Sequence, residues 1–142
     1  MKYSFKLSHE IHILVFIHTA EGLDVSSNKI AESIHTNPGC VRQLMSSLRN
    51  AGIIKSVTGH PKPALAKKPG DISLLDVYKA VEGDKPLLHL DTQTNPECGI
   101  GVNIQYALQS FYDNVQKDAE ESMSKISLDD IITEFHYRTF YQ

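Results

Sequence analysis

One long amphipathic segment, residues 99–125, constrains the fold of this 142-residue chain more than any other feature. The segment contains no proline, and its apolar residues recur every three or four positions, as they do along one face of a helix. This stripe consists of Ile104, Leu108, Phe111, Val115, Ala119, Met123 and Ile126, widened by Tyr106, Ala107 and Tyr112. A helix of that length spans about 40 Å, so we do not expect so small a domain to cover it alone.

Residues 8–66 predict three short helices followed by a hairpin. The helices are expected at 8–19, 26–34 and 38–51, the first strand at 53–57, the hairpin tip at 58–63 and the return strand at 64–66. In the first helix, we expect Glu10 in an acidic first turn and His18 facing inward as a core histidine. Three helices followed by a hairpin are typical of a winged helix-turn-helix.

The third helix of this group has an acid-free polar side. Its apolar residues form one stripe that we expect to be buried: Val41, Leu44, Met45, Leu48 and Ala51. The opposite side consists of Gly39, Cys40, Arg42, Gln43, Ser46, Ser47, Arg49 and Asn50. A solvated surface helix usually mixes both signs of charge, so this side favours insertion into the major groove of DNA. There, Arg42 is suited to guanine and Gln43 to adenine. Ser46 permits close approach, and Gly39 keeps the first turn slim.

Further candidates for DNA binding surround this helix and are suited to phosphate contacts. They are Thr36, Asn37 and Arg49 near the third helix, Asn28 and Lys29 at the start of the second, and His60 and Lys62 in the hairpin. Taken alone, the hairpin is better explained as an ordinary solvated turn, and the start of the second helix as an ordinary cap. Their assignment therefore depends on the acid-free helix beside them.

Charge is divided unevenly along the chain, whose net charge is −3. Residues 1–68 hold nine Lys or Arg and four Asp or Glu, whereas residues 69–142 hold five and thirteen. Polyanions respond to local basic surface through counterion release, so the first half favours nucleic-acid binding despite the negative total. Solubility alone is the alternative explanation of such asymmetry.

The second half predicts two more helices and a connecting loop. A capping box at Ser73 predicts a helix that ends at Gly83, and a similar start at Ser127 predicts a last helix running toward Tyr137. The chain is therefore predicted to be mainly α with a small β-wing. We divide it into a winged helix-turn-helix domain at 1–83, a linker loop at 84–98, and the long and last helices at 99–142.

Several function classes are disfavoured by the residues. The chain shows no phosphate-binding loop, nucleophile elbow or paired-carboxylate motif, which argues against an enzyme, and no histidine pair has the further ligands that a metal site requires. The longest apolar run, 11–17, is too short to cross a membrane, and two distant cysteines suit a reducing cytoplasm. Cys98 is a candidate redox thiol at a helix start, although a buried apolar role is favoured.

Four segments resemble signature blocks of the Rrf-two family of bacterial transcription regulators: "IHILVFI", "IAESIHTNPGCVRQLMSSLRNAGII", "LAKKPGDISLLDVYKAVEG" and "CGIG". The resemblance runs from about residue 4 to 132 and implies a dimeric winged-helix DNA binder, usually a repressor. It implies a recognition helix at Asn37–Asn50, a wing at Thr58–Ala66 and a last helix that packs back on the DNA-binding part. The long helix would pair two subunits through Ile104, Leu108, Phe111, Tyr112, Val115 and Ala119.

The chain departs from the members of this family that sense iron, nitric oxide or redox state, which carry three cysteines before the long helix. Only Cys98 lies in that region here, so the chain resembles the branch without an iron–sulfur cluster and is expected to need no cofactor. An effector, either a protein or a small molecule, is compatible with that branch. We expect a cytoplasmic homodimer that binds a palindromic operator in double-stranded DNA. The alternatives are a protein-interaction module that regulates an enzyme and, less favoured, a thiol redox enzyme centred on Cys98.

Overall fold

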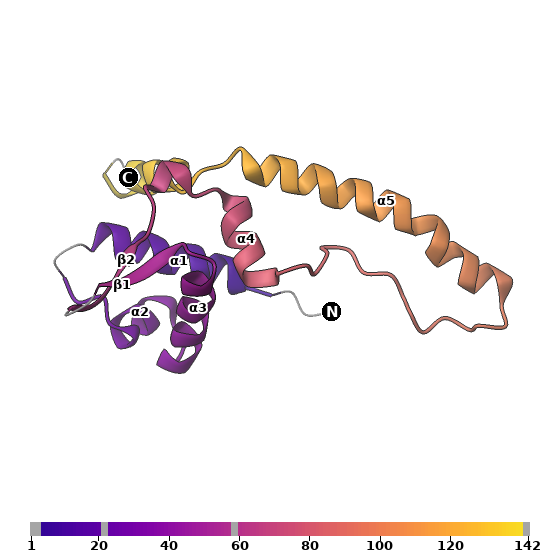
Figure 1. Cartoon of the computed structure of the whole chain (residues 1–142), viewed down its shortest axis with the longest axis horizontal. Helices are drawn as coiled ribbons and strands as arrows, with labels where there is room; N and C mark the ends of the chain where they lie inside the picture. The colour runs from indigo at the N-terminus through magenta and orange to yellow at the C-terminus, as the bar shows by residue number, and fades with distance from the viewer. Residues whose placement is uncertain (1–3, 21–22, 58–59, 141–142) are drawn as a thin grey trace.

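The computed structural model describes residues 4–20, 23–57 and 60–140, without the side chains of residues 57, 60 and 61. Its elements are α1 (Lys6–Thr19), α2 (Ser27–Ile34), α3 (Pro38–Asn50), β1 (Ile54–Val57), β2 (His60–Leu65), the 3₁₀ turn η1 (Pro69–Asp71), α4 (Leu74–Glu82), α5 (Gly99–Ser124) and α6 (Leu128–Phe140). The described elements are mainly helices, with β1 and β2 forming a two-stranded antiparallel sheet. This confirms the predicted fold class. Figure 1 shows a body from which α5 extends as a long rod.

The helix-turn-helix is defined by side-chain caps and a sharp turn. Ser26 Oγ accepts a hydrogen bond from the Lys29 N–H at 3.3 Å at the start of α2, and Asn37 Oδ1 accepts one from the Cys40 N–H at 2.8 Å at the start of α3. Between the two helices, His35 has the left-handed φ of 64° and ends α2. These local features set how α3 is presented relative to α2.

The hydrophobic core lies where α1, α2, α3, α4 and α6 meet. Its members are buried aliphatic side chains from each of these helices and from the segments around β1 and α4: Ile13, Leu14, Ile17, Ile30, Ala31, Val41, Leu44, Met45, Leu48, Ile53, Ile54, Ile72, Val77, Leu128 and Ile132. The core therefore includes a helix from the end of the chain as well as the first four.

Helices α4 and α6 begin with capping boxes of the same design and are joined to each other at these starts. In both Ser73–Asp76 and Ser127–Asp130, the serine Oγ accepts the aspartate N–H at 3.0 Å, and the aspartate carboxylate accepts the serine N–H at 2.9 Å. The two starts lie side by side, because the Leu128 N–H donates to the Ile72 carbonyl at 2.7 Å. From this bridge, Leu128 and Ile132 enter the core of the body.

Several local predictions about α1 and the hairpin were wrong. The first helix begins at Lys6 rather than at residue 8, so its first turn contains no acidic residue, and Glu10 lies beyond that turn and is completely buried. His18 is exposed rather than part of the core. The return strand begins at His60 and not at residue 64, because a strand of a two-stranded sheet has a free edge where the missing N–H of proline is tolerated.

The long helix α5 runs from Gly99 to Ser124 as predicted, and it has no buried residue. Figure 1 shows that its C-terminal end approaches α4, while its N-terminal end lies far from the body. Within the described ranges, neither α5 nor any other helix has the length and apolarity needed to cross a membrane.

Candidate nucleic-acid interface

Helix α3 buries one side and exposes the other, as its residue pattern requires. Its buried residues are Val41, Leu44, Met45 and Leu48. On the opposite side, Arg42, Gln43, Ser46 and Arg49 are exposed, together with Cys40 and Asn50, while Gly39 and Ser47 are half-buried. The acid-free side identified in the sequence is therefore a continuous solvent-facing surface, free to approach a partner.

Gly39 fits closely against the cap of its own helix. A Cβ placed on Gly39 would lie 3.1 Å from Asn37 Oδ1, the atom that accepts the Cys40 N–H. A larger residue at position 39 would thus disturb the first turn of α3 as well as thicken the surface. The absence of a side chain at Gly39 therefore serves the cap of α3 as well as the slim first turn.

A hollow of about 260 Å³ opens between α3, the start of α2 and the wing. Arg42 and Arg49 line it from α3, Ser27 lines it from the first turn of α2, and Pro63 lines it from β2. The first amides of a helix have no acceptor within the helix and carry its positive dipole end. Two guanidinium groups beside such a helix start form a surface complementary to a phosphate group.

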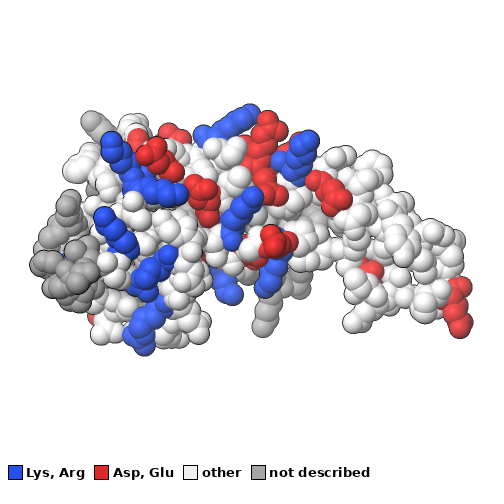
Figure 2. Space-filling model, in the orientation of Figure 1, with Lys and Arg blue, Asp and Glu red and all other residues white. Residues whose placement is uncertain are grey.

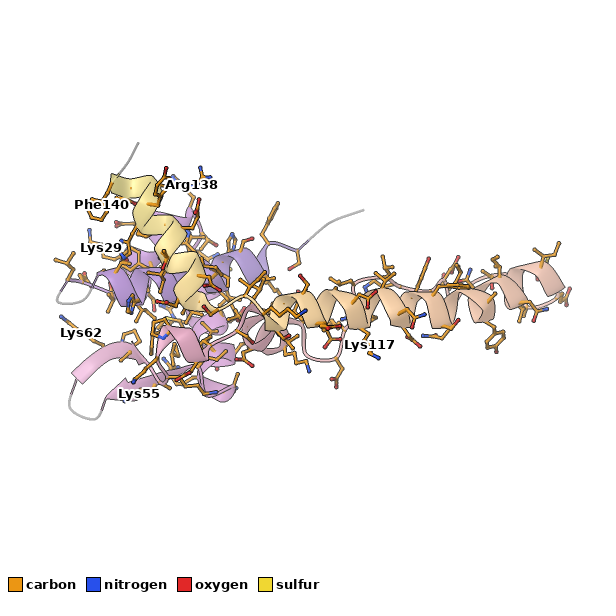
Figure 3. The ribbon with its side chains drawn as sticks, turned by 90° about the horizontal axis from the view of Figure 1, so that it is seen from above. Lys29, Lys55, Lys62, Lys117, Arg138 and Phe140 are labelled. Carbon is orange, nitrogen blue, oxygen red and sulfur yellow. The ribbon has the colours of Figure 1, made fainter. Side chains whose placement is uncertain are left out.

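Lysines extend this basic surface on both sides. Lys29 on α2 and Lys62 on β2 both lower the pKa of Asp24, although that pKa is lowered chiefly by hydrogen bonds from Ser26. Figure 3 shows Lys29, Lys62 and Lys55 at the end of the molecule opposite the free end of α5. Lys55, exposed on β1, was missed in the sequence, although its place beside the predicted wing was a usable signal.

The remaining predicted contact residues lie around the same surface. Asn28 is exposed in the first turn of α2, Thr36 is half-buried in the turn, and Asn37 is exposed while capping α3. Lys29 also forms an ion pair with Glu32 at 3.5 Å. The side chain of His60 and the tip at residues 58–59 lie outside the described residues, so their predicted contacts stay predictions.

The two signs of charge are unevenly distributed on the face of the molecule shown in Figure 2. Lysine and arginine side chains prevail on the lower left part of the body, whereas acidic and basic side chains are intermixed near the junction of the body with α5. The free end of α5 shows acidic groups in this view. This arrangement agrees with the uneven charge of the two halves of the sequence.

A second candidate surface is the apolar stripe of α5. Phe111 is 66% exposed, Ile104 49% and Val115 48%, while Leu108 and Ala119 are half-buried. Tyr112 faces a hollow beside the loop that follows α4. Ile100, 80% exposed at the free end, was not among the predicted residues. Exposed apolar side chains in such a row are typical of a protein interface.

The cysteines correct one prediction. Cys98 is the exposed N-cap residue of α5, so the preference for a buried apolar role was wrong. Cys40 is also exposed, on α3. Figure 1 shows α3 and the start of α5 in separate parts of the molecule. Among the described residues, no group of three or more His, Cys, Asp or Glu side chains is placed to hold a metal ion.

Comparisons with known proteins agree with this arrangement. The model of the family described as "Rrf2: Iron-dependent Transcriptional regulator" matches residues 3–134. YwnA of Bacillus subtilis (strain 168), named as an HTH-type transcriptional regulator, is 40% identical over 127 residues, which cover 89% of this chain and 94% of YwnA. A solved structure described as a DNA-binding protein is 39% identical, with a TM-score of 0.72, and the match covers 89% of this chain and 98% of that one.

The solved structure of T. potens IscR is 28% identical, with a TM-score of 0.71, and the match covers 100% of this chain and 93% of that one. The relatives and the family are transcriptional regulators and not enzymes. The match to the family model covers nearly the whole chain, and YwnA shares well over a third of its residues. The chain therefore belongs to the Rrf2 family of DNA-binding transcriptional regulators.

Proposed function

We propose that this protein is a homodimeric repressor that binds a palindromic operator by placing α3 in the major groove. The acid-free exposed side of α3 carries this proposal. This side presents two arginines and a glutamine beside the basic start of α2. It carries no carboxylate that would repel DNA phosphates. Repression is the role that the family resemblance implies.

The proposed contacts divide into base reading and positioning. Arg42 and Gln43 reach base edges, and Ser46 between them permits close approach. Arg49, at the hollow beside the start of α2, binds phosphate together with Asn28, Thr36 and Asn37. Lys29, Lys62 and His60 add phosphate contacts at the edges of the surface.

The apolar stripe of α5 supports a homodimer. Ile104, Phe111 and Val115 share one face of a 26-residue helix that has no buried residue in its own chain. Pairing with a second copy through a two-fold axis covers the same stripe on both subunits. The two recognition helices would then meet half-sites separated by one helical turn of DNA, about 34 Å, or a multiple of it.

We further propose that the regulator works without an iron–sulfur cluster, although its family is described as iron-dependent. Such clusters are held by several cysteine thiolates. The whole chain has two cysteines, and of these only Cys98 lies near the loop before α5. The donor set does not fit a cluster.

The test begins by selecting binding sites from random double-stranded DNA with the purified full chain and no added metal. We expect a palindromic consensus. Arg42→Ala should weaken binding to it by about 1–3 kcal/mol and relax the preference at one base pair of each half-site. Arg138→Ala is a matched control, because Figure 3 places Arg138 on α6, away from the wing.

Lys62→Ala should weaken binding to all sequences alike and reduce the salt slope by about one unit per half-site. Lys117→Ala on α5 removes the same charge elsewhere and should leave the slope unchanged. If the protein selects no sequence and binds no DNA at low salt, a protein-interaction role replaces this proposal. If Arg42→Ala weakens random and selected DNA equally, Arg42 contacts phosphate instead of bases.

A further inference from the structure

The loop at residues 84–98 is fixed against α5 at two points. The Leu87 N–H donates to Gln116 Oε1 at 2.8 Å, and the Asp91 N–H donates to Gln105 Oε1 at 2.9 Å. Gln105 and Gln116 are eleven residues apart, about three helical turns, so both side chains leave the same face of α5. The loop is thus held like a strap along that face.

A hollow of about 560 Å³ lies beneath this strap, which is within the usual range for small-molecule sites. Its floor is the part of α5 between the two glutamines, including Tyr112 and Asp113, and its side is formed by α4. One wall is held by Tyr78, whose hydroxyl donates to the Lys85 carbonyl and accepts from Gln116 Nε2, both at 3.2 Å. Tyr78 is only 3% exposed, so this wall is fixed before any ligand arrives.

The lining of the hollow carries both signs of charge. Lys79 and Glu120 neutralise each other at one end, with Nζ and Oε1 3.6 Å apart. Lys85 also lines the hollow and, within the described residues, makes no salt bridge. Asp113 on the floor uses one carboxylate oxygen to accept Gln109 Nε2 at 2.8 Å, which leaves its second oxygen available.

The lining also includes apolar side chains. Leu88 and Leu90 lie on the strap side, and the ring of Tyr112 lies on the floor. A ligand that matches this lining has an ammonium group for Asp113, a carboxylate for Lys85, and an apolar part between or beside them. We infer that the hollow is a binding site for a small zwitterion, an amino acid or a dipeptide.

Dimerisation through the exposed stripe of α5 leaves this site open, because Tyr112, which the sequence grouped with that stripe, lines the hollow instead. Ile104, Phe111 and Val115 lie about a third of the helix circumference away from the face that carries Gln105 and Gln116. A ligand under the strap also contacts α4, which packs in the core beside α3. An effect of the ligand on DNA binding depends on the proposed function, whereas the binding itself does not.

The test uses the full chain without DNA and follows its melting temperature and the heat of binding. The probes are each proteinogenic amino acid and a set of alanyl dipeptides, each compared with its N-acetyl and methyl-ester forms. We expect at least one zwitterion to bind saturably and to raise the melting temperature, and both blocked forms to lose this effect. If no member of the set binds, or if blocked forms bind equally well, the inference is overturned.

Two variants locate the site. Asp113→Asn and Lys85→Gln should each weaken binding about tenfold or more, because each removes a charge-assisted contact. Asp118→Asn, an exposed carboxylate on the same helix outside the hollow, is the matched control and should bind normally. Unchanged binding by Asp113→Asn would place any bound zwitterion elsewhere. Failure of DNA binding in the earlier experiment would leave this result untouched.

Discussion

Glu10 gives the sharpest test of how this fold is stabilised. Its side chain is 0% exposed in the core contact of α1 with α4, and neither carboxylate oxygen has a hydrogen-bond partner within the described residues. The pKa of Glu10 is raised from 4.5 to about 8. Burial is the main cause, the carboxylate of Glu82 adds to the increase, and Lys6 acts against it. The folded protein therefore holds a proton on Glu10 at neutral pH, while the unfolded chain releases it.

This difference sets the sign of the pH dependence. At Glu10 the folded state binds more protons than the unfolded state between pH 4.5 and about 8, so the contribution of Glu10 to stability falls as pH rises through that range. At about 1.36 kcal/mol per pKa unit, Glu10 lowers the free energy of unfolding by ~2.5 kcal/mol between about pH 5 and about pH 7. Glu10→Gln keeps the shape of the side chain and removes the titration. The variant should gain this amount relative to wild type over the same interval.

Urea unfolding at a fixed protein concentration measures the effect at each pH. Comparing variant with wild type cancels other titrations, including that of His12, whose pKa is lowered by burial and by His9. Glu97→Gln, an exposed carboxylate in the loop, is the matched control and should follow wild type at every pH. A stability difference between Glu10→Gln and wild type that stays constant from about pH 5 to about pH 7 would refute a buried, protonated Glu10.

Three further predictions concern caps, the turn and the α5 stripe. Ser73→Ala removes one half of a capping box and should lower the free energy of unfolding by about 1 kcal/mol, measured in urea, and an unchanged value would contradict the cap. His35→Gly removes the side chain that disfavours the left-handed φ of 64°, so it should raise the free energy of unfolding by about 0.5–1 kcal/mol. A lower free energy of unfolding would show that the His35 side chain stabilises the turn. Phe111→Asp should yield monomers in sedimentation analysis at concentrations where the wild type is dimeric. Asp118→Asn, at an exposed position of the same helix, should remain dimeric. A dimer that survives Phe111→Asp would exclude this stripe as the interface.

Local signals in the sequence predicted much of this fold because their causes are local. Both capping boxes were recognised from a serine followed three residues later by an aspartate, and both contain the reciprocal hydrogen bonds. The stripe of α3 was predicted from helical spacing, and its members Val41, Leu44, Met45 and Leu48 are buried, whereas Ala51, at the C-cap, is exposed. Caps and amphipathic spacing depend on residues a few positions apart, so one sequence is sufficient to find them.

The errors and omissions arose where distant segments meet. Glu10 was assigned to an acidic first turn, because its burial follows from the packing of α1 against other helices, which the local sequence does not display. Cys98 looked like a small core residue, yet the free end of α5 leaves it exposed. The two strap contacts of Gln105 and Gln116 join segments more than ten residues apart and have no sequence signature. Such contacts depend on tertiary arrangement, which a single sequence does not display.

Helix α4 is one of two connections between α5 and the helices that support α3, and the other is α6, which follows α5 directly and enters the same core. The strap leaves the body at the end of α4, and the chain returns from α5 beside the start of α4, where Leu128 bonds to Ile72. The segment that contains the strap and α5 therefore begins and ends beside the same nine-residue helix, α4. The same helix buries Val77 in the core that supports α3 and adjoins the buried Glu10. A displacement of α5 relative to the body therefore reaches the core at α4 as well as at α6, and a ligand beneath the strap would act directly beside the first of these two connections.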